Sequence, residues 1–76
     1  MTLDKAAMEQ PYKIVGFETL DDEHKLRLSA VGVREEAVIT KLLHTPLKNP
    51  VECMVGPQLL ALDAWLLSRI RVSAAP

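Results

Sequence analysis

The sequence predicts a mainly β protein, a small closed barrel of five or six short antiparallel strands with one inserted short α-helix. Short segments rich in aliphatic residues alternate with turns that contain Pro or Gly, which is the pattern of small barrels. A single stretch carries both a helix start and a helix stop. The 76-residue chain is expected to form one domain, residues 1–76. At this size roughly 60% of the unfolded surface is buried, so the core is thin.

The helix is expected at about residues 22–31. The carboxylate of Asp21 can accept a backbone N–H of the first turn, which makes it a good N-cap. Asp22 and Glu23 then lie where the helix dipole favours negative charge. Gly32 ends the helix, because glycine adopts the left-handed conformation without a Cβ clash. The stripe expected to face the core recurs at i, i+4 and i+7: His24, Leu28 and Val31.

The strands are expected to be short, and hairpins connect those that follow the helix. Their ranges are 12–17, 37–44, 51–55, 58–62 and 69–72, with Thr2-Leu3 as a short edge strand. Barrel closure is expected, because an open edge on so small a sheet promotes aggregation. Residues 63–68 are expected to form one 3₁₀ turn and residues 73–76 a tail.

Composition argues against several classes of protein. The net charge of −1 disfavours a nucleic-acid-binding face or a polybasic membrane surface. The longest apolar run, residues 59–67, is interrupted by Asp63 and is shorter than the ~20 residues of a membrane span. The beginning of the chain lacks the apolar core of a secretory signal, and one cysteine allows no internal disulfide, so a cytoplasmic protein is expected.

The sequence predicts no enzyme, cofactor or metal site. It offers no nucleophile with a plausible base, and so short a chain is expected to leave little room for a cleft of ~300 Å³. His24, His44 and Cys53 are the candidate metal ligands, but none has a metal-ligand spacing. Cys53 alternates with Val51 and Val55, and we interpret it as a core residue rather than a reactive thiol. His24 is interpreted as packed and His44 as solvated, while the acids 21–23 are interpreted as helix-capping groups rather than metal ligands.

Apolar surface is the main functional signal of the sequence. Trp65 either covers an end of the barrel or, together with Leu66, forms an exposed partner or self-association surface. The loop at residues 45–50 is stiffened by two prolines, and Leu47 within it either only fixes the turn or offers a preordered contact. The residues predicted to bind a partner are Leu43, Pro46, Leu47, Leu59, Trp65 and Leu66.

Short motifs spread over the whole chain resemble the FeoA family, the small cytosolic accessory proteins of bacterial ferrous iron transport. The matching segments are Ile14-Val15-Gly16-Phe17, Arg27-Leu28, Val31-Gly32, Thr45-Pro46-Leu47, Asn49-Pro50-Val51-Glu52, Leu60-Ala61-Leu62, Ile70 and Val72. The resemblance implies an SH3-like barrel with an inserted helix. It also implies a membrane partner, the FeoB permease, which is a GTPase with a transmembrane part.

The sequence departs from the family pattern at three places. Glu35-Glu36 stands where the family usually has Pro-Gly, and Lys48-Asn49 stands where it has Gly-Asp. Leu43, Leu59 and Asp63 replace positions that tend to be arginine, so apolar surface is expected where the family has charge.

Three functional hypotheses follow from the sequence. The preferred one is a non-enzymatic interaction module that binds the cytosolic part of the FeoB permease, with weak self-association of the chain as an additional property. The first alternative is an SH3-like regulatory domain related to those of iron-dependent repressors. The second is a small metal-binding chaperone or sensor that uses His and Cys.

Overall fold

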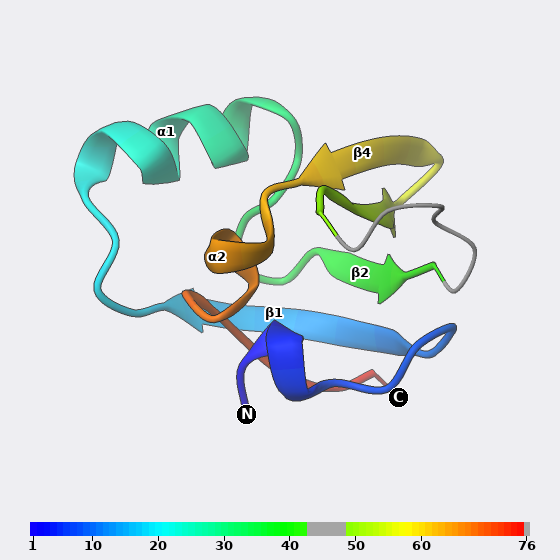
Figure 1. Ribbon diagram of the computed structural model, residues 1–76. Coiled ribbons are helices and arrows are strands. Elements are labelled where there is room, and N and C mark those ends of the chain that lie inside the picture. The colour runs from blue at the N-terminus through cyan, green and yellow to red at the C-terminus, as the bar shows by residue number, and fades with distance from the viewer. Residues whose placement is uncertain (43–48, 76) are drawn as a thin grey trace.

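The computed structural model describes residues 1–42 and 49–75, which form a curved antiparallel sheet accompanied by short helices (Figure 1). In chain order the elements are the 3₁₀-helix η1 (Leu3–Lys5), β1 (Pro11–Phe17), α1 (Asp22–Ala30), β2 (Val38–Lys41), β3 (Val51–Val55), β4 (Gln58–Leu62), α2 (Ala64–Leu67) and β5 (Ile70–Ala74). The prediction of a mainly β fold with a short helix near residues 22–31 is confirmed.

The sheet has five strands in the order β4-β3-β2-β1-β5, and every neighbouring pair is antiparallel. β4 and β5 are therefore its two edges in the part of the chain that the structure describes, and no backbone ladder joins them there. In the described residues the sheet is therefore not closed by a hydrogen-bonded ladder between its two edges. The short helices α2 and η1, which come from opposite parts of the chain, contact each other.

Strand alternation divides the residues between the core and the outer face. Along β1, Tyr12, Ile14 and Gly16 are buried, while Val15 is exposed. The largest side chains that are fully buried come from β1, β2, β3, β5, η1 and the turn after α1: Leu3, Ile14, Val33, Ile39, Cys53, Ile70 and Val72. Lys41 is the buried charged residue in this part of the chain, and its Nζ donates to the backbone oxygen of Asp4 at 3.3 Å.

The helix α1 begins and ends as its sequence predicts. The backbone N–H of His24 donates to Oδ1 of Asp21 at 2.8 Å, so Asp21 is the N-cap. At the other end, Val33 N–H donates to Leu28 O at 2.8 Å and Gly32 N–H donates to Ser29 O at 3.0 Å. These two bonds form a Schellman motif, and Gly32 has the positive φ of +92° that the motif requires.

Four expectations about the elements are wrong in detail. Val31 is the C-cap of α1 and is exposed, because the chain has left helical geometry before its side chain could join the inward stripe. Thr2 forms an isolated bridge to Arg71, and the chain then enters η1 rather than an edge strand. The expected 3₁₀ turn at residues 63–68 is the α-helical turn α2. Residues 73 and 74 were expected in the tail but belong to β5, because pairing with β1 extends this strand to Ala74.

The strand expected at residues 37–44 is shorter at its start. It begins at Val38, because the backbone groups of Ala37 are engaged in the preceding turn and with Ile14. Residues 43–44 of that prediction lie outside the described residues.

The turn at Glu35-Glu36 places a charged residue in a backbone conformation that suits glycine. Glu36 has a φ of 76°, and its N–H donates to Ile14 O at 2.8 Å, so the surrounding sheet fixes this conformation. A left-handed conformation costs a non-glycine residue about 1–2 kcal/mol. The exposed ion pair between Glu36 and Lys13, at 3.5 Å, offsets little of that cost.

Replacing Glu36→Gly is therefore expected to increase the free energy of unfolding by about 0.5–1 kcal/mol, because the relief of backbone strain exceeds the loss of a surface ion pair. Urea denaturation at neutral pH measures the change. Glu35→Gly is the matched control, since Glu35 has no positive φ, and it should be neutral or destabilising. Equal effects of the two substitutions would contradict a strained turn at Glu36.

Candidate functional site

The structure describes three of the six predicted partner-binding residues. Leu43, Pro46 and Leu47 lie outside the described residues. Leu59 and Trp65 are exposed to 56% and 48% of their surface, so both side chains are accessible.

Leu66 was expected to be exposed, and that expectation is wrong, because its side chain is 9% exposed and belongs to the core. The reason is the geometry of α2. A single helical turn directs Leu66 and Leu67 inward and leaves Trp65 outward.

Leu59 and Trp65 lie on different parts of the molecule. Leu59 is near the start of β4, beside the Gly56-Pro57 turn, while Trp65 is on α2, beyond the other end of β4 (Figure 1). An extended strand advances about 3.3 Å per residue, so the length of β4 separates them. Leu59 and Trp65 therefore lie on two separate surfaces.

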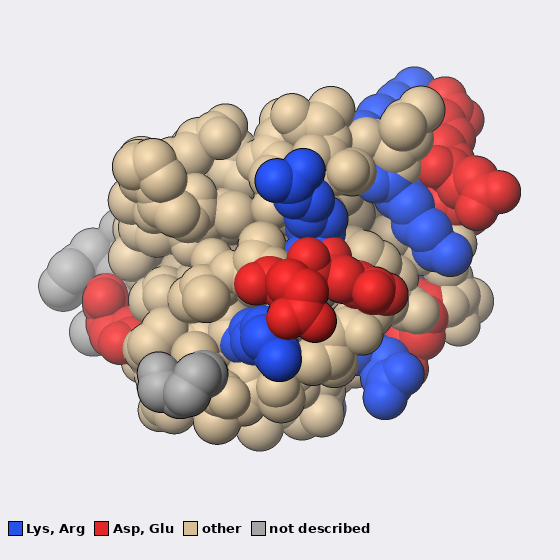
Figure 2. Space-filling view, turned by 180° about the vertical axis from the view of Figure 1, so that it is seen from behind, with Lys and Arg blue, Asp and Glu red and all other residues tan. Residues whose placement is uncertain are grey.

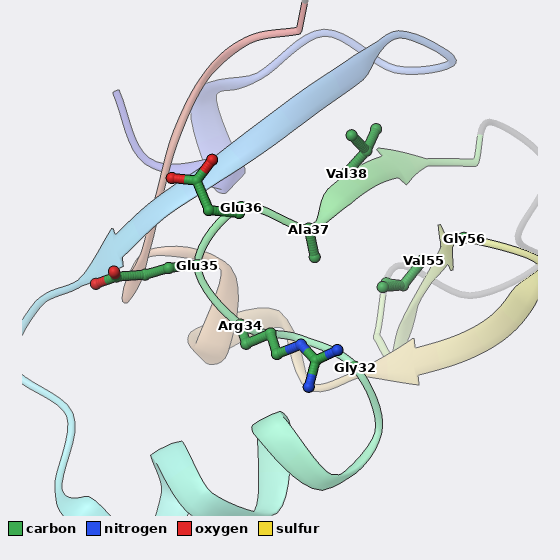
Figure 3. Close-up of a pocket in the computed structure, with 8 residues that line it drawn as sticks. All are labelled: Gly32, Arg34, Glu35, Glu36, Ala37, Val38, Val55 and Gly56. Carbon is green, nitrogen blue, oxygen red and sulfur yellow. The ribbon is translucent and has the colours of Figure 1, made fainter.

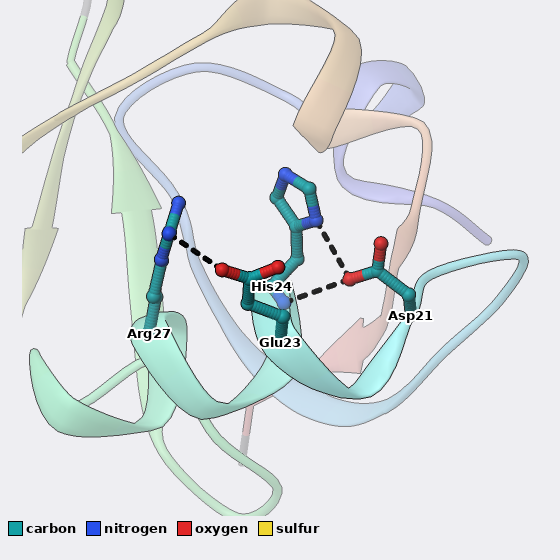
Figure 4. A network of polar contacts seen from close by, with 4 residues as sticks. All are labelled: Asp21, Glu23, His24 and Arg27. Carbon is teal, nitrogen blue, oxygen red and sulfur yellow. Dashed lines mark hydrogen bonds and ion pairs between the residues drawn. The ribbon is translucent and has the colours of Figure 1, made fainter.

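Trp65 packs against the first turn of α1. The ring of His24 meets it edge-on, with 5.4 Å between centroids and 81° between planes. Nδ1 of His24 lies 2.7 Å from Oδ1 of Asp21, and Arg27 bonds Glu23 at 2.7 Å on the same helix (Figure 4). This geometry agrees with the interpretation of His24 as a packed residue and of Asp21 as the helix cap.

The hydrogen bonds that Asp21 accepts favour its charged form. The backbone N–H of His24 contributes most and the His24 ring adds to it, so the pKa of Asp21 lies below its ordinary value. The cap is therefore complete above that ordinary value and weakens as the pH falls toward the lowered pKa.

A second surface lies where the loop after α1 passes the β3–β4 turn. It is a hollow of about 520 Å³, and Figure 3 shows the residues that line it: Gly32, Arg34, Glu35, Glu36, Ala37, Val38, Val55 and Gly56. The expectation that so short a chain leaves little room for a cleft is thus wrong. The two sides of the hollow are contributed by segments about twenty residues apart in sequence, which composition cannot reveal.

Val38 lines this hollow and also belongs to the outer face of the sheet. Val38 points outward from β2 and is 43% exposed. The register pairs Thr40 with Met54 and Met54 with Leu59, so Val38, Met54 and Leu59 share one face of neighbouring strands. We call these three residues the apolar row. Of these three residues, the sequence singled out only Leu59, although the alternation of Val38 with buried Ile39 also indicates that Val38 points outward.

Charge on the surface is mixed in sign. The face shown in Figure 2 has acidic side chains near its centre with Lys and Arg around them, beside a broad area without charge. Near the hollow, Glu36 pairs with Lys13, whereas Arg34 and Glu35 form no ion pair within the described part of the chain. The hollow therefore offers one cation and one carboxylate at the margin of an apolar floor.

The described residues contain no group of three or more His, Cys, Asp and Glu side chains that could hold a metal ion. Cys53 is fully buried, and burial raises the pKa of its thiol from 9.0 to about 11. It lies in the core with Val55 and Ile39, as the strand alternation predicts. No helix of the described chain is both long enough and apolar enough to cross a bilayer.

Comparison with known proteins gives the family. The family model for the FeoA domain matches residues 1–74. The chain belongs to the FeoA family. No curated protein sequence matches this FeoA domain closely enough to count as a relative.

Solved structures share the fold of this FeoA domain. Iron(II) transport protein A from Clostridium thermocellum is 23% identical with a TM-score of 0.81, and the alignment covers 97% of this chain and 45% of that protein. FeoA from Stenotrophomonas maltophilia, solved with zinc and described as a prokaryotic SH3 domain protein, is 21% identical with a TM-score of 0.74 and coverages of 96% and 89%. The SH3-like fold is thus confirmed.

The same fold occurs in a manganese-dependent transcriptional repressor, with 9% identity, a TM-score of 0.82 and coverages of 99% of this chain and 41% of the repressor. Identity this low shows a shared fold alone. The chain spans less than half of both the repressor and the Clostridium protein.

The burial of Cys53 generates a prediction about stability at high pH. The thiol has a pKa of 9.0 when unfolded and of about 11 when folded. Its contribution to the free energy of unfolding is therefore complete below pH 9 and is lost as the pH rises toward 11. Two pKa units correspond to about 2–3 kcal/mol.

Urea denaturation at pH 8 and pH 10.5 measures this loss. Cys53→Ala is the control, because it removes the thiol and leaves every other ionisable group in place. The free energy of unfolding should fall less steeply with pH in this variant. The same slope in both proteins would contradict a buried thiol with a raised pKa.

Proposed function

We propose that this FeoA-family protein is a non-enzymatic accessory module of bacterial ferrous iron uptake that acts in the cytoplasm. Its partner would be the cytosolic part of the FeoB permease. Membership of the family supports the pathway, and an SH3-like fold is compatible with an interaction module. The fold by itself does not specify an activity, so the proposal rests on family membership and on the surface of the molecule.

The single observation that carries the proposal is the apolar row, which shares Val38 with the lining of the hollow. Exposed apolar side chains that adjoin a concave surface are typical of protein contacts. Val38, Met54 and Leu59 lie on three neighbouring hydrogen-bonded strands, so little conformational entropy would be lost when they are covered.

Trp65 marks a less favourable alternative surface. Its ring already packs against His24, so part of its apolar area is covered within the molecule. We therefore place the proposed contact on the apolar row and the hollow, with Arg34 and Glu35 as polar groups at the margin.

The test is binding of the tagged protein to detergent-solubilised FeoB permease. The double substitution Val38→Thr and Leu59→Gln should weaken binding at least about tenfold, because it removes the apolar contacts while leaving a fold-compatible polar surface. Circular dichroism melting confirms that the variant remains folded.

Leu26→Gln is the matched control, since Leu26 is an exposed leucine on α1, away from the apolar row. It should bind as the unmodified protein does. Loss of binding in the control but not in the double variant would overturn the proposed surface. Recovery of a transcriptional repressor instead of the permease would overturn the proposed partner.

A further inference from the structure

The two edges of the sheet differ in how they are covered. Along β5, Val72 exchanges hydrogen bonds with Met1, since Val72 N–H donates to Met1 O at 2.8 Å and the amino group of Met1 donates to Val72 O at 3.4 Å. Thr2 also bridges to Arg71. Along β4, no backbone partner other than β3 is found among the described residues.

The register of the β3–β4 hairpin identifies the groups at this open edge. Gly56 and Pro57 form a two-residue turn closed by the pair Val55 and Gln58, so Gln58, Leu60 and Leu62 direct their backbone groups toward β3. The hydrogen bonds on the other edge of β3 are consistent with this register. There Glu52 O accepts from Leu42 N–H, so the backbone groups of Glu52 point away from β4. Leu59 and Ala61 therefore direct one N–H and one C=O each away from the sheet.

β4 lacks the features that usually protect an edge strand. Its sequence Gln-Leu-Leu-Ala-Leu contains no charge and no proline, and its pairing with β3 has no bulge. Leu59 is also largely exposed. An edge of this kind favours pairing with another strand.

We propose that β4 pairs with β4 of a second copy of this chain, antiparallel and about a two-fold axis at Leu60. Leu59 then pairs with the Ala61 of the other copy at both symmetric positions. This register engages all four outward groups of each strand. Shifting the axis to Leu59 would place Pro57, which has no N–H, opposite Ala61, and shifting it to Ala61 would place Asp63 opposite Leu59.

The side chains of β4 and the small net charge of the chain are compatible with a second copy of this chain paired along β4. On the outer face, each Leu59 lies beside the small Ala61 of the other copy, and the two half-buried Leu60 side chains meet at the axis. The strand carries no charge, and the chain has a net charge of −1, so two copies repel each other weakly. The pairing would extend the sheet continuously through both copies.

The test uses sedimentation velocity at concentrations from 10 µM to 1 mM, roughly the range in which one strand pair is expected to associate. The unmodified chain should show a sedimentation coefficient that rises with concentration. Ala61→Pro should weaken association at least about tenfold, because it removes two of the four intermolecular hydrogen bonds. The β3–β4 ladder is retained, since the N–H of Ala61 points away from β3.

Ala74→Pro is the matched control on the other edge, where the N–H of residue 74 also points away from its neighbour β1. It should associate as the unmodified chain does. A second measurement is amide hydrogen exchange of the unmodified chain, in which Leu59 and Ala61 should become protected as concentration rises.

A chain that remains monomeric at 1 mM would overturn the proposal. So would equal association of Ala61→Pro and the unmodified chain, or protection that does not change at Leu59 and Ala61. The proposal does not rest on permease binding, although Leu59 belongs to both proposed surfaces, and none of these measurements requires the permease.

Discussion

Backbone pairing along both sides of β1 is the interaction on which the rest of the structure depends. β1 is bonded to β2 on one side and to β5 on the other, so it joins the first and last parts of the chain. The helix α1 lies in the connection between β1 and β2 and returns the chain to the same sheet. The side chains of Tyr12 and Ile14 lie in the core, so β1 offers an apolar surface that η1 and α2 cover.

Local signals in the sequence were sufficient for much of the fold. The Asp21 cap, the glycine at the end of α1 and the hairpin of β3 and β4 each depend on residues within a few positions of one another. The alternation of Cys53 with Val51 and Val55 predicted that Cys53 lies in the core, as it does. In a thin core these local preferences agree with the global fold.

The features that the sequence did not reveal depend on contacts between distant residues. Leu66 is buried because α2 packs beside η1, which lies at the other end of the chain. β5 extends to Ala74 because Tyr12 pairs with it. The hollow exists because the loop after α1 passes the β3–β4 turn, and neither segment alone indicates a concave surface.

The Gly56-Pro57 turn has a consequence for how the sheet assembles. Gly56 has a φ of +58°, and glycine followed by proline is a sequence that favours a type II′ hairpin turn. Pairing of β3 with β4 requires only the closure of a two-residue loop. Pairing of β1 with β5 requires closure of a loop that contains most of the chain, so it loses more conformational entropy. We expect the β3–β4 hairpin to form early during folding and the β1–β5 ladder to form late. The rate of folding should therefore depend chiefly on the pairing of β1 with β5.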